Sequence, residues 1–131
     1  MRLLLDTHVL LWASQGSRRL GRKAAALIVR PESEIWISAA TVWEIANKAA
    51  LARLRLRQPA EKWLPAEMKA NDYRPLAITI DHALAAATLP RHHEDPFDRM
   101  LIAQAQLEDL RILTADEKFQ AYDVGVIDAT L

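Results

Sequence analysis

The chain has 131 residues, which predicts a single domain, residues 1–131, with enough length for a buried core. Its 17 basic and 17 acidic residues cancel, so a nucleic acid would have to be bound by a local patch and not by the overall charge. The chain has no cysteine, which excludes disulfides and thiolate metal sites and leaves oxygen and imidazole as the strong metal ligands. No segment resembles a signal peptide or reaches the roughly 20 apolar residues of a membrane span, so we expect a cytoplasmic protein.

Short apolar runs alternate with helix-like segments along the chain. Strands are predicted near residues 2–5, 35–37, 75–79, 111–114 and 124–127. Helices are predicted at residues 9–13, 21–29, 40–50, 59–71, 81–88 and 96–108, with a short one from Glu117. Pro65 indicates that the segment 59–71 is either kinked or split into two helices. Strands separated by helices favour right-handed crossovers, so the predicted class is α/β, with three layers and a five-stranded, mostly parallel sheet flanked by helices.

Four acids follow strand-like runs or open helix-like segments: Asp6, Glu44, Asp98 and Asp116. The carboxyl ends of parallel strands lie at one edge of a sheet, where open α/β sheets bind ligands, so we expect the four side chains to converge there. Clustered carboxylates repel one another unless a cation neutralises them. Because Mg²⁺ and Mn²⁺ prefer oxygen ligands completed by water and substrate phosphates, the pattern predicts phosphoryl chemistry by a metal-activated water.

Taken singly, each acid also has a structural explanation. Asp6 could accept hydrogen bonds in a turn, and Asp116 could be an N-cap. Glu44 could pair with Lys48 across one helical turn. Asp95 is better explained as the N-cap of the helix 96–108 than as a ligand. Capping does not explain why acids recur at the same end of successive strands, so the metal cluster is the preferred interpretation.

Other chemistry-bearing residues give weaker signals. The adjacent pair His92 and His93 does not favour zinc, because neighbouring side chains point in different directions and no second pair of ligands has the usual spacing. Among the four tryptophans, Trp12 and Trp43 are the first candidates for an interface. Two basic clusters could be solvated faces or could bind flanking phosphates; they are Arg18-Arg19 with Arg22-Lys23, and Arg53 with Arg55 and Arg57.

Four segments in the same order closely resemble the PIN-domain ribonucleases, specifically the VapC-type toxins of bacterial toxin–antitoxin modules. They are residues 3–8 (Leu-Leu-Leu-Asp-Thr-His), 38–45 (Ser-Ala-Ala-Thr-Val-Trp-Glu-Ile), 92–105 (which contains Asp-Pro-Phe-Asp-Arg) and 113–116 (Leu-Thr-Ala-Asp). A lone Asp-Thr-His would be a weak signal, whereas the ordered set is specific. The resemblance covers nearly the whole chain.

The resemblance implies a PIN-like fold and a Mg²⁺- or Mn²⁺-dependent endoribonuclease that cuts structured RNA such as tRNA or rRNA. Position by position, the core metal-binding and catalytic acids are matched by Asp6, Glu44 and Asp98, and the fourth, more variable acid by Asp116. Asp95 matches an acid whose role stays open between cap and outer-shell ligand. Small polar positions that support the acids are matched by Thr7, Ser38 and Thr114.

The resemblance also implies partners. We expect a homodimer and a cognate VapB-type antitoxin, which would insert a C-terminal segment into the active-site groove. The antitoxin would supply the DNA-binding domain, so this chain would contact DNA only indirectly. No membrane partner is expected.

Two other classes of function remain open. A haloacid-dehalogenase-like phosphatase would need a second acid two residues after its nucleophile, where this chain has His8. A non-catalytic PIN-like binding module would be expected to lack one of the acids, and all four are present.

Overall fold

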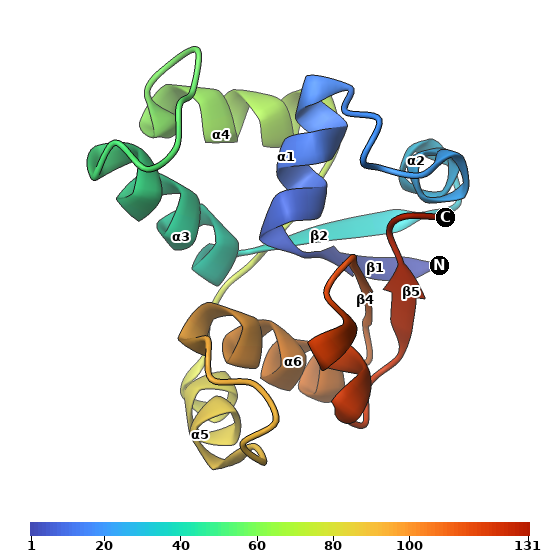
Figure 1. Ribbon diagram of the computed structural model, residues 1–131, viewed down its shortest axis with the longest axis vertical. Coiled ribbons are helices and arrows are strands. Elements are labelled where there is room, and N and C mark those ends of the chain that lie inside the picture. The colour runs from blue at the N-terminus through green and yellow to red at the C-terminus, as the bar shows by residue number, and fades with distance from the viewer.

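The computed structural model describes residues 1–131 and contains one parallel sheet covered by helices (Figure 1). The strands are β1 (Arg2–Leu5), β2 (Glu34–Ser38), β3 (Arg74–Leu76), β4 (Arg111–Thr114) and β5 (Val126–Asp128). The helices are α1 (Thr7–Gln15), α2 (Arg22–Val29), α3 (Ala39–Ala50), α4 (Ala60–Ala70), α5 (Ile80–Thr88) and α6 (Pro96–Glu108), followed by a 3₁₀ helix, η1 (Glu117–Ala121). All strand pairs are parallel, so the predicted α/β class is confirmed.

Several predicted boundaries need correction. The third strand is shorter than the predicted 75–79 because the chain leaves the sheet to reach Thr79, whose side chain caps α5. The fifth strand lies at Val126–Asp128 and not at 124–127. The first helix begins at Thr7, directly after its N-cap, and ends before Gly16, whose φ of 61° is in the left-handed region. Pro65 lies inside one continuous helix, so the alternative of two helices is wrong.

The order of the strands places a crevice beside β1. The sheet order is β3-β2-β1-β4-β5, so the chain builds outward from β1 to β3 and then returns to the other side of β1. In open α/β sheets such a reversal leaves a crevice at the carboxyl ends of the two central strands. Leu5 pairs with Leu113 at this end, and the Asp6 amide donates to the Leu113 carbonyl at 3.1 Å. The first predicted acid therefore lies at the crevice.

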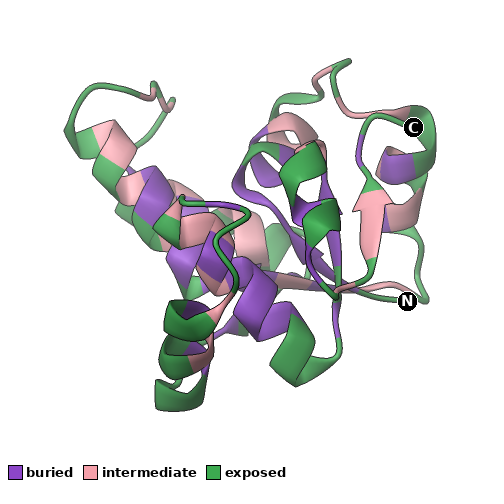
Figure 2. Ribbon diagram, turned by 60° about the horizontal axis from the view of Figure 1, so that its bottom comes forward, coloured by how far each residue is buried: buried purple, intermediate pink, exposed green.

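Each face of the sheet carries its own apolar core. Leu3 and Leu5 of β1 pack on the side of α1 to α4, whereas Leu4 packs with Ile102 and Phe119 on the side of α6 and η1. This alternation follows from the two-residue period of a strand. Figure 1 shows α1, α2 and α4 on one side of the sheet and α5 and α6 on the other, and Figure 2 shows buried residues concentrated between these layers. None of the helices combines the length and apolar character that a membrane crossing needs.

The loop between α5 and α6 is fixed by a buried arginine. Arg99, the last residue of the Asp-Pro-Phe-Asp-Arg motif, is 5% exposed. Its guanidinium donates hydrogen bonds of 2.8–3.2 Å to four main-chain carbonyls, those of Ala86, Leu89, Pro90 and His93. These bonds satisfy carbonyls at the end of α5 and in the following loop, and they fix the segment that leads into α6.

Candidate active site

The four predicted acids line one cavity at the carboxyl ends of the central strands. This cavity has a volume of about 370 Å³. Its lining comprises Asp6, His8, Trp12, Arg19, Glu44, Lys48, Asp95, Asp98, Ala115 and Asp116. The expected convergence is therefore present, and the assignment of catalytic and metal-binding roles to these acids stays a prediction.

Asp6 is a helix cap and a member of the cluster at once. Its Oδ1 accepts the Thr7 amide at 2.7 Å, and its Oδ2 accepts the Thr114 hydroxyl at 2.7 Å. Burial raises the pKa of Asp6, an effect that these two hydrogen bonds partly oppose and that the nearby charge of Glu44 reinforces. Asp6 thus accepts a hydrogen bond as the N-cap of α1 and not within a turn, and this role does not compete with the cluster.

Glu44 is buried in α3, and each of its carboxylate oxygens has one polar partner. Its Oε1 accepts the Thr7 hydroxyl at 2.7 Å, and its Oε2 lies 2.5 Å from the Lys48 ammonium. The predicted pairing with Lys48 is therefore present. Since the Thr7 hydroxyl donates to Glu44 while the Thr7 amide donates to Asp6, this one threonine connects two of the four acids.

Ser38 supports a helix and not an acid. Its hydroxyl accepts the Ala40 amide at 3.0 Å as the N-cap of α3 and lies 2.5 Å from Oε1 of Gln104, a fully buried residue of α6. No hydrogen bond joins Ser38 to any of the four acids, so any support that it gives them is indirect. The contact fixes α3 against α6, the two helices that carry Glu44 and Asp98.

Asp98 is the acid whose negative charge the surrounding protein compensates least. Asp95 caps α6 by accepting the amides of Phe97 and Asp98 at 2.9 and 3.2 Å, so its capping role is present as predicted. Burial, followed by the charges of the other acids, raises the pKa of Asp98 to about 8. A carboxyl group in this state marks the position where an added cation would be most favourable.

Asp116 caps the 3₁₀ helix as anticipated. Its Oδ1 accepts the Lys118 amide at 2.9 Å, and its own amide donates to the Thr114 hydroxyl at 3.0 Å. Thr114 therefore contacts both Asp6 and Asp116, in agreement with its predicted supporting position. The Asp116 side chain is partly exposed at the cavity.

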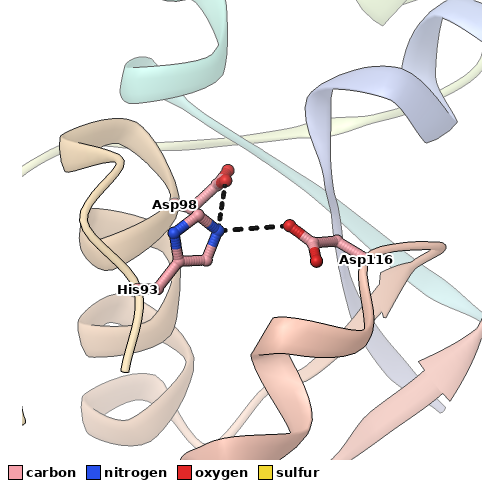
Figure 3. A group of neighbouring side chains, drawn as sticks. All are labelled: His93, Asp98 and Asp116. Atoms are coloured by element: carbon pink, nitrogen blue, oxygen red, sulfur yellow. Dashed lines mark hydrogen bonds and ion pairs between the residues drawn. The ribbon is translucent and has the colours of Figure 1, made fainter. Parts of the chain in front are cut away.

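His93 joins the acids, which the sequence did not predict. Its Nε2 lies 2.9 Å from Asp98 Oδ2 and 3.1 Å from Asp116 Oδ2 (Figure 3). Its neighbour His92 is exposed and packs edge-on against the Tyr122 ring. The two rings thus contact different neighbours, in agreement with the expectation for adjacent residues. Proximity of His93 to the Asp-Pro-Phe-Asp-Arg motif was the only available signal for its position.

Only the first of the two basic clusters, and only Trp12 of the two candidate tryptophans, contribute to the lining of the acidic cavity. Arg19, from the first basic cluster, lines the acidic cavity together with Lys48. Arg55 and Arg57, from the second cluster, line a separate hollow beside Trp63. Trp12 is half-buried in the cavity wall, whereas Trp43 is 62% exposed. A larger apolar hollow of about 920 Å³ between α3 and α4 contains none of the four acids.

The residues of the cavity fit a hard divalent cation. All four candidate ligands are carboxylates, and each oxygen that accepts one hydrogen bond keeps a further lone pair. Oxygen ligands of this kind suit Mg²⁺ and Mn²⁺. The observation in favour is that four carboxyl groups from separate elements line one cavity; burial and their mutual proximity raise the pKa of Asp98, and a bound cation would favour its charged form.

Comparisons with known proteins agree with this geometry. The PIN-domain family profile matches residues 3–125. Ribonuclease VapC22 of Mycobacterium tuberculosis is 31% identical over 121 residues, which cover 92% of this chain and 91% of that protein. The chain belongs to the PIN-domain family and, within that family, to the VapC type.

Solved structures share the fold at low sequence identity. VapBC2 from Rickettsia felis, bound to a promoter DNA fragment, has a TM-score of 0.73 at 11% identity and covers 98% of both chains. VapBC-5 from Mycobacterium tuberculosis has a TM-score of 0.62 at 20% identity and covers 97% of this chain and 98% of its own. At these identities the similarity concerns the fold alone.

Proposed function

We propose that this PIN domain is a Mg²⁺- or Mn²⁺-dependent endoribonuclease that acts as the toxin of a type II toxin–antitoxin system. The observation that carries the proposal is the convergence of Asp6, Glu44, Asp98 and Asp116 in one cavity. The similarity to Ribonuclease VapC22 over nearly the full length of both chains supports RNA as the substrate. A structured RNA such as tRNA or rRNA is the proposed target, in the cytoplasm.

In this proposal the four acids hold the divalent ion. When bound, the ion would activate and orient a water and would offset the charge that develops on the phosphodiester. Thr7 and Thr114 fix the directions of the Asp6 and Glu44 carboxylates by hydrogen bonds. Arg19 lies in the same cavity and is placed to bind a flanking phosphate of the RNA.

Cleavage by an Asp98→Asn variant tests the assignment. This substitution removes one ligand charge, and we expect the cleavage rate to fall by roughly a thousandfold, equivalent to about 4 kcal/mol. The N-cap at Asp95 is retained, so α6 should still form. Asp81→Asn is the matched control, because Asp81 is an exposed acid in the first turn of α5. A folded Asp98→Asn protein that cleaves RNA at the wild-type rate in saturating Mn²⁺ would contradict the proposal.

We further propose a VapB-type antitoxin as the partner, with a homodimer of this chain in the complex. The similar structures of VapBC complexes support this, and DNA would be contacted only through the antitoxin. A cluster of acids is best blocked by a cation, so the antitoxin segment should present Arg or Lys to Asp6, Glu44 and Asp98. Titration with antitoxins carrying Ala at each basic residue of that segment, with cleavage and binding measured separately, tests this. If every variant inhibits as well as wild type, inhibition is steric.

The same preparations distinguish the other classes of function. A haloacid-dehalogenase-like phosphatase would hydrolyse small phosphate esters, and we expect no turnover of them because His8 stands where the second acid would be needed. A non-catalytic binding module would leave both RNA and small esters intact while still binding the antitoxin.

A further inference from the structure

Contacts with neighbouring residues hold both the ring and the main chain of His93 in place. The side chain is 7% exposed and lies edge-on to the Phe119 ring, with the ring centroids 5.8 Å apart. The His93 amide donates to the Tyr122 hydroxyl at 2.8 Å, and its carbonyl accepts from Arg99 at 3.2 Å. The Tyr122 hydroxyl in turn donates to the Pro90 carbonyl at 2.7 Å. Both the ring and the main chain are therefore fixed independently of the acids.

The hydrogen bonds determine which nitrogen carries the proton. The Asp95 amide donates to His93 Nδ1 at 3.3 Å. A main-chain N–H can only donate, so Nδ1 must present its lone pair and the ring proton is on Nε2. Nε2 is the nitrogen that faces Asp98 and Asp116. It therefore approaches the acids as an N–H donor, which excludes it as a metal ligand in this tautomer.

The two acids that face Nε2 have little else to hold them together. Asp98 is on α6, whereas Asp116 follows β4, so they come from separate elements of the fold. Oδ1 of Asp116 is engaged by the Lys118 amide, which leaves Oδ2 for His93. No hydroxyl or main-chain amide donates to the Asp98 carboxylate in the way that Thr7 and Thr114 donate to Asp6. Like charges placed so close repel, and the His93 Nε2–H is the donor that contacts both carboxylates.

We propose that His93 is a positioning residue, whose Nε2–H fixes the Asp98 and Asp116 carboxylates so that their remaining lone pairs face one divalent ion. The inference rests on the proposed function, because it assigns a role within that site. Groups that orient metal-binding side chains in this way typically change metal affinity or activity by about 10–100-fold when removed. Because the His93 Nε2 is directed at two proposed metal-binding acids, its effect should appear in the metal dependence.

Two substitutions and one control test the proposal with Mg²⁺ as the probe. His93→Phe keeps the ring against Phe119 but removes the donor, so the half-saturating Mg²⁺ concentration should rise by about 10–100-fold. The KM for RNA at saturating Mg²⁺ should stay within about twofold, because a positioning role acts through the ion. His93→Gln supplies an amide N–H near the same place and should restore most of the Mg²⁺ affinity. His92→Phe is the control, because His92 is exposed and should behave as wild type.

The same variants can be measured without RNA. Mg²⁺ binding followed by calorimetry should show the same order of affinity, with wild type and His92→Phe strongest, His93→Gln next and His93→Phe weakest. Equal Mg²⁺ affinity for folded His93→Phe and wild type would overturn the proposal. So would a His93→Gln variant as impaired as His93→Phe.

The tautomer gives a test on the unmodified chain. In ¹⁵N-correlated NMR spectra of the metal-free wild type, we expect Nε2 of His93 to be protonated and Nδ1 to be unprotonated, with no exchange of these roles when Mg²⁺ is added. Protonated Nδ1, or loss of the Nε2 proton on adding Mg²⁺, would overturn the proposal. A wild-type protein that fails to cleave RNA would refute the proposed function, whereas the spectra and the calorimetry decide the role of His93 separately.

Discussion

The two halves of the acidic cavity are stabilised differently. In the Asp6–Glu44 half, both carboxylates accept hydrogen bonds from threonines, and Glu44 also pairs with Lys48. In the Asp98–Asp116 half, the shared group is one imidazole, and Asp98 has the pKa of about 8. The carboxylates of the first half therefore have more hydrogen-bond donors, although burial also raises the pKa of Asp6, whereas Asp98 in the second half has the larger rise in pKa. A bound ion should stabilise the protein mainly through the second half.

The largest difference should appear in the pH dependence of stability without metal. The pKa of Asp98 rises from its ordinary 3.8 to about 8 on folding, so between these values the folded protein keeps a proton that the unfolded chain has lost. The free energy of unfolding should fall as pH increases through this window, by up to about 1.4 kcal/mol per pH unit, and the fall should end above pH 8. Urea unfolding of wild type and Asp98→Asn at several pH values measures this.

Asp98→Asn should remove most of that slope, whereas Asp6→Asn should remove less, because the rise in the Asp6 pKa is opposed by the Thr7 and Thr114 hydrogen bonds. Identical pH profiles for wild type and Asp98→Asn would show that the uncompensated charge is not at Asp98.

Metal should give the next largest effect. Mg²⁺ or Mn²⁺ binds the folded protein and relieves the repulsion, so an ion at 100 times its dissociation constant should add about 2.7 kcal/mol of stability. For a domain of this size that is an increase in Tm of roughly 10 °C. Asp98→Asn should be more stable than wild type without metal and should respond less to it. Thermal unfolding with and without millimolar Mn²⁺ measures both, and equal responses in the two proteins would contradict the assignment of Asp98 as a ligand.

Removing a threonine hydroxyl should have a smaller effect on the Asp6–Glu44 half. Thr7→Val keeps the shape of the side chain but leaves Glu44 Oε1 without its hydroxyl donor, so we expect a loss of about 1–3 kcal/mol in metal-free protein. Thr88→Val is a suitable control, because the exposed Thr88 hydroxyl only bonds carbonyls within α5. Its free energy of unfolding should change by less than about 0.5 kcal/mol. Equal losses for the two variants would mean that Glu44 is not dependent on Thr7.

The smallest expected effect concerns the aromatic contact between the two halves. Trp43 on α3 lies edge-on to Phe97 on α6, with the ring centroids 5.7 Å apart. A double-mutant cycle with Ala at both positions should give a coupling of about 0.5–1 kcal/mol. Because Trp43 is largely exposed, Trp43→Ala should weaken antitoxin binding more than it lowers stability. A coupling near zero would show that this pair does not connect the halves.

The sequence predicted the acids because each obeys a local rule. Asp6 directly follows β1, Asp116 lies two residues after the end of β4, and Asp98 lies in the first turn of a helix whose Asp-Pro start is explicit. Two strands and the helix α6 were predicted at their observed bounds for the same reason. Local rules also explain why some of these acids have structural roles as well: the end of a strand is also the start of a helix, so one carboxylate can cap and face the cavity.

The sequence could not predict contacts between distant segments. Ser38 and Gln104 are 66 residues apart, and the residue type at neither position indicates that α3 packs against α6. The position of the His93 main chain depends on Tyr122, 29 residues further on, and on Arg99 beneath the loop. The third strand was predicted too long because the apolar pattern of 75–79 does not reveal that Thr79 caps α5.

The buried guanidinium of Arg99 has a consequence for local unfolding. Loops usually open more readily than helices, and their amides then exchange quickly with solvent. Here the segment before α6 can open only if four carbonyls lose their shared donor together. The amides of His93 and Asp95, both hydrogen-bonded to side chains, should therefore exchange with deuterium as slowly as those of neighbouring helices. Arg99→Lys, with three donors in place of five, should accelerate their exchange before it affects the sheet.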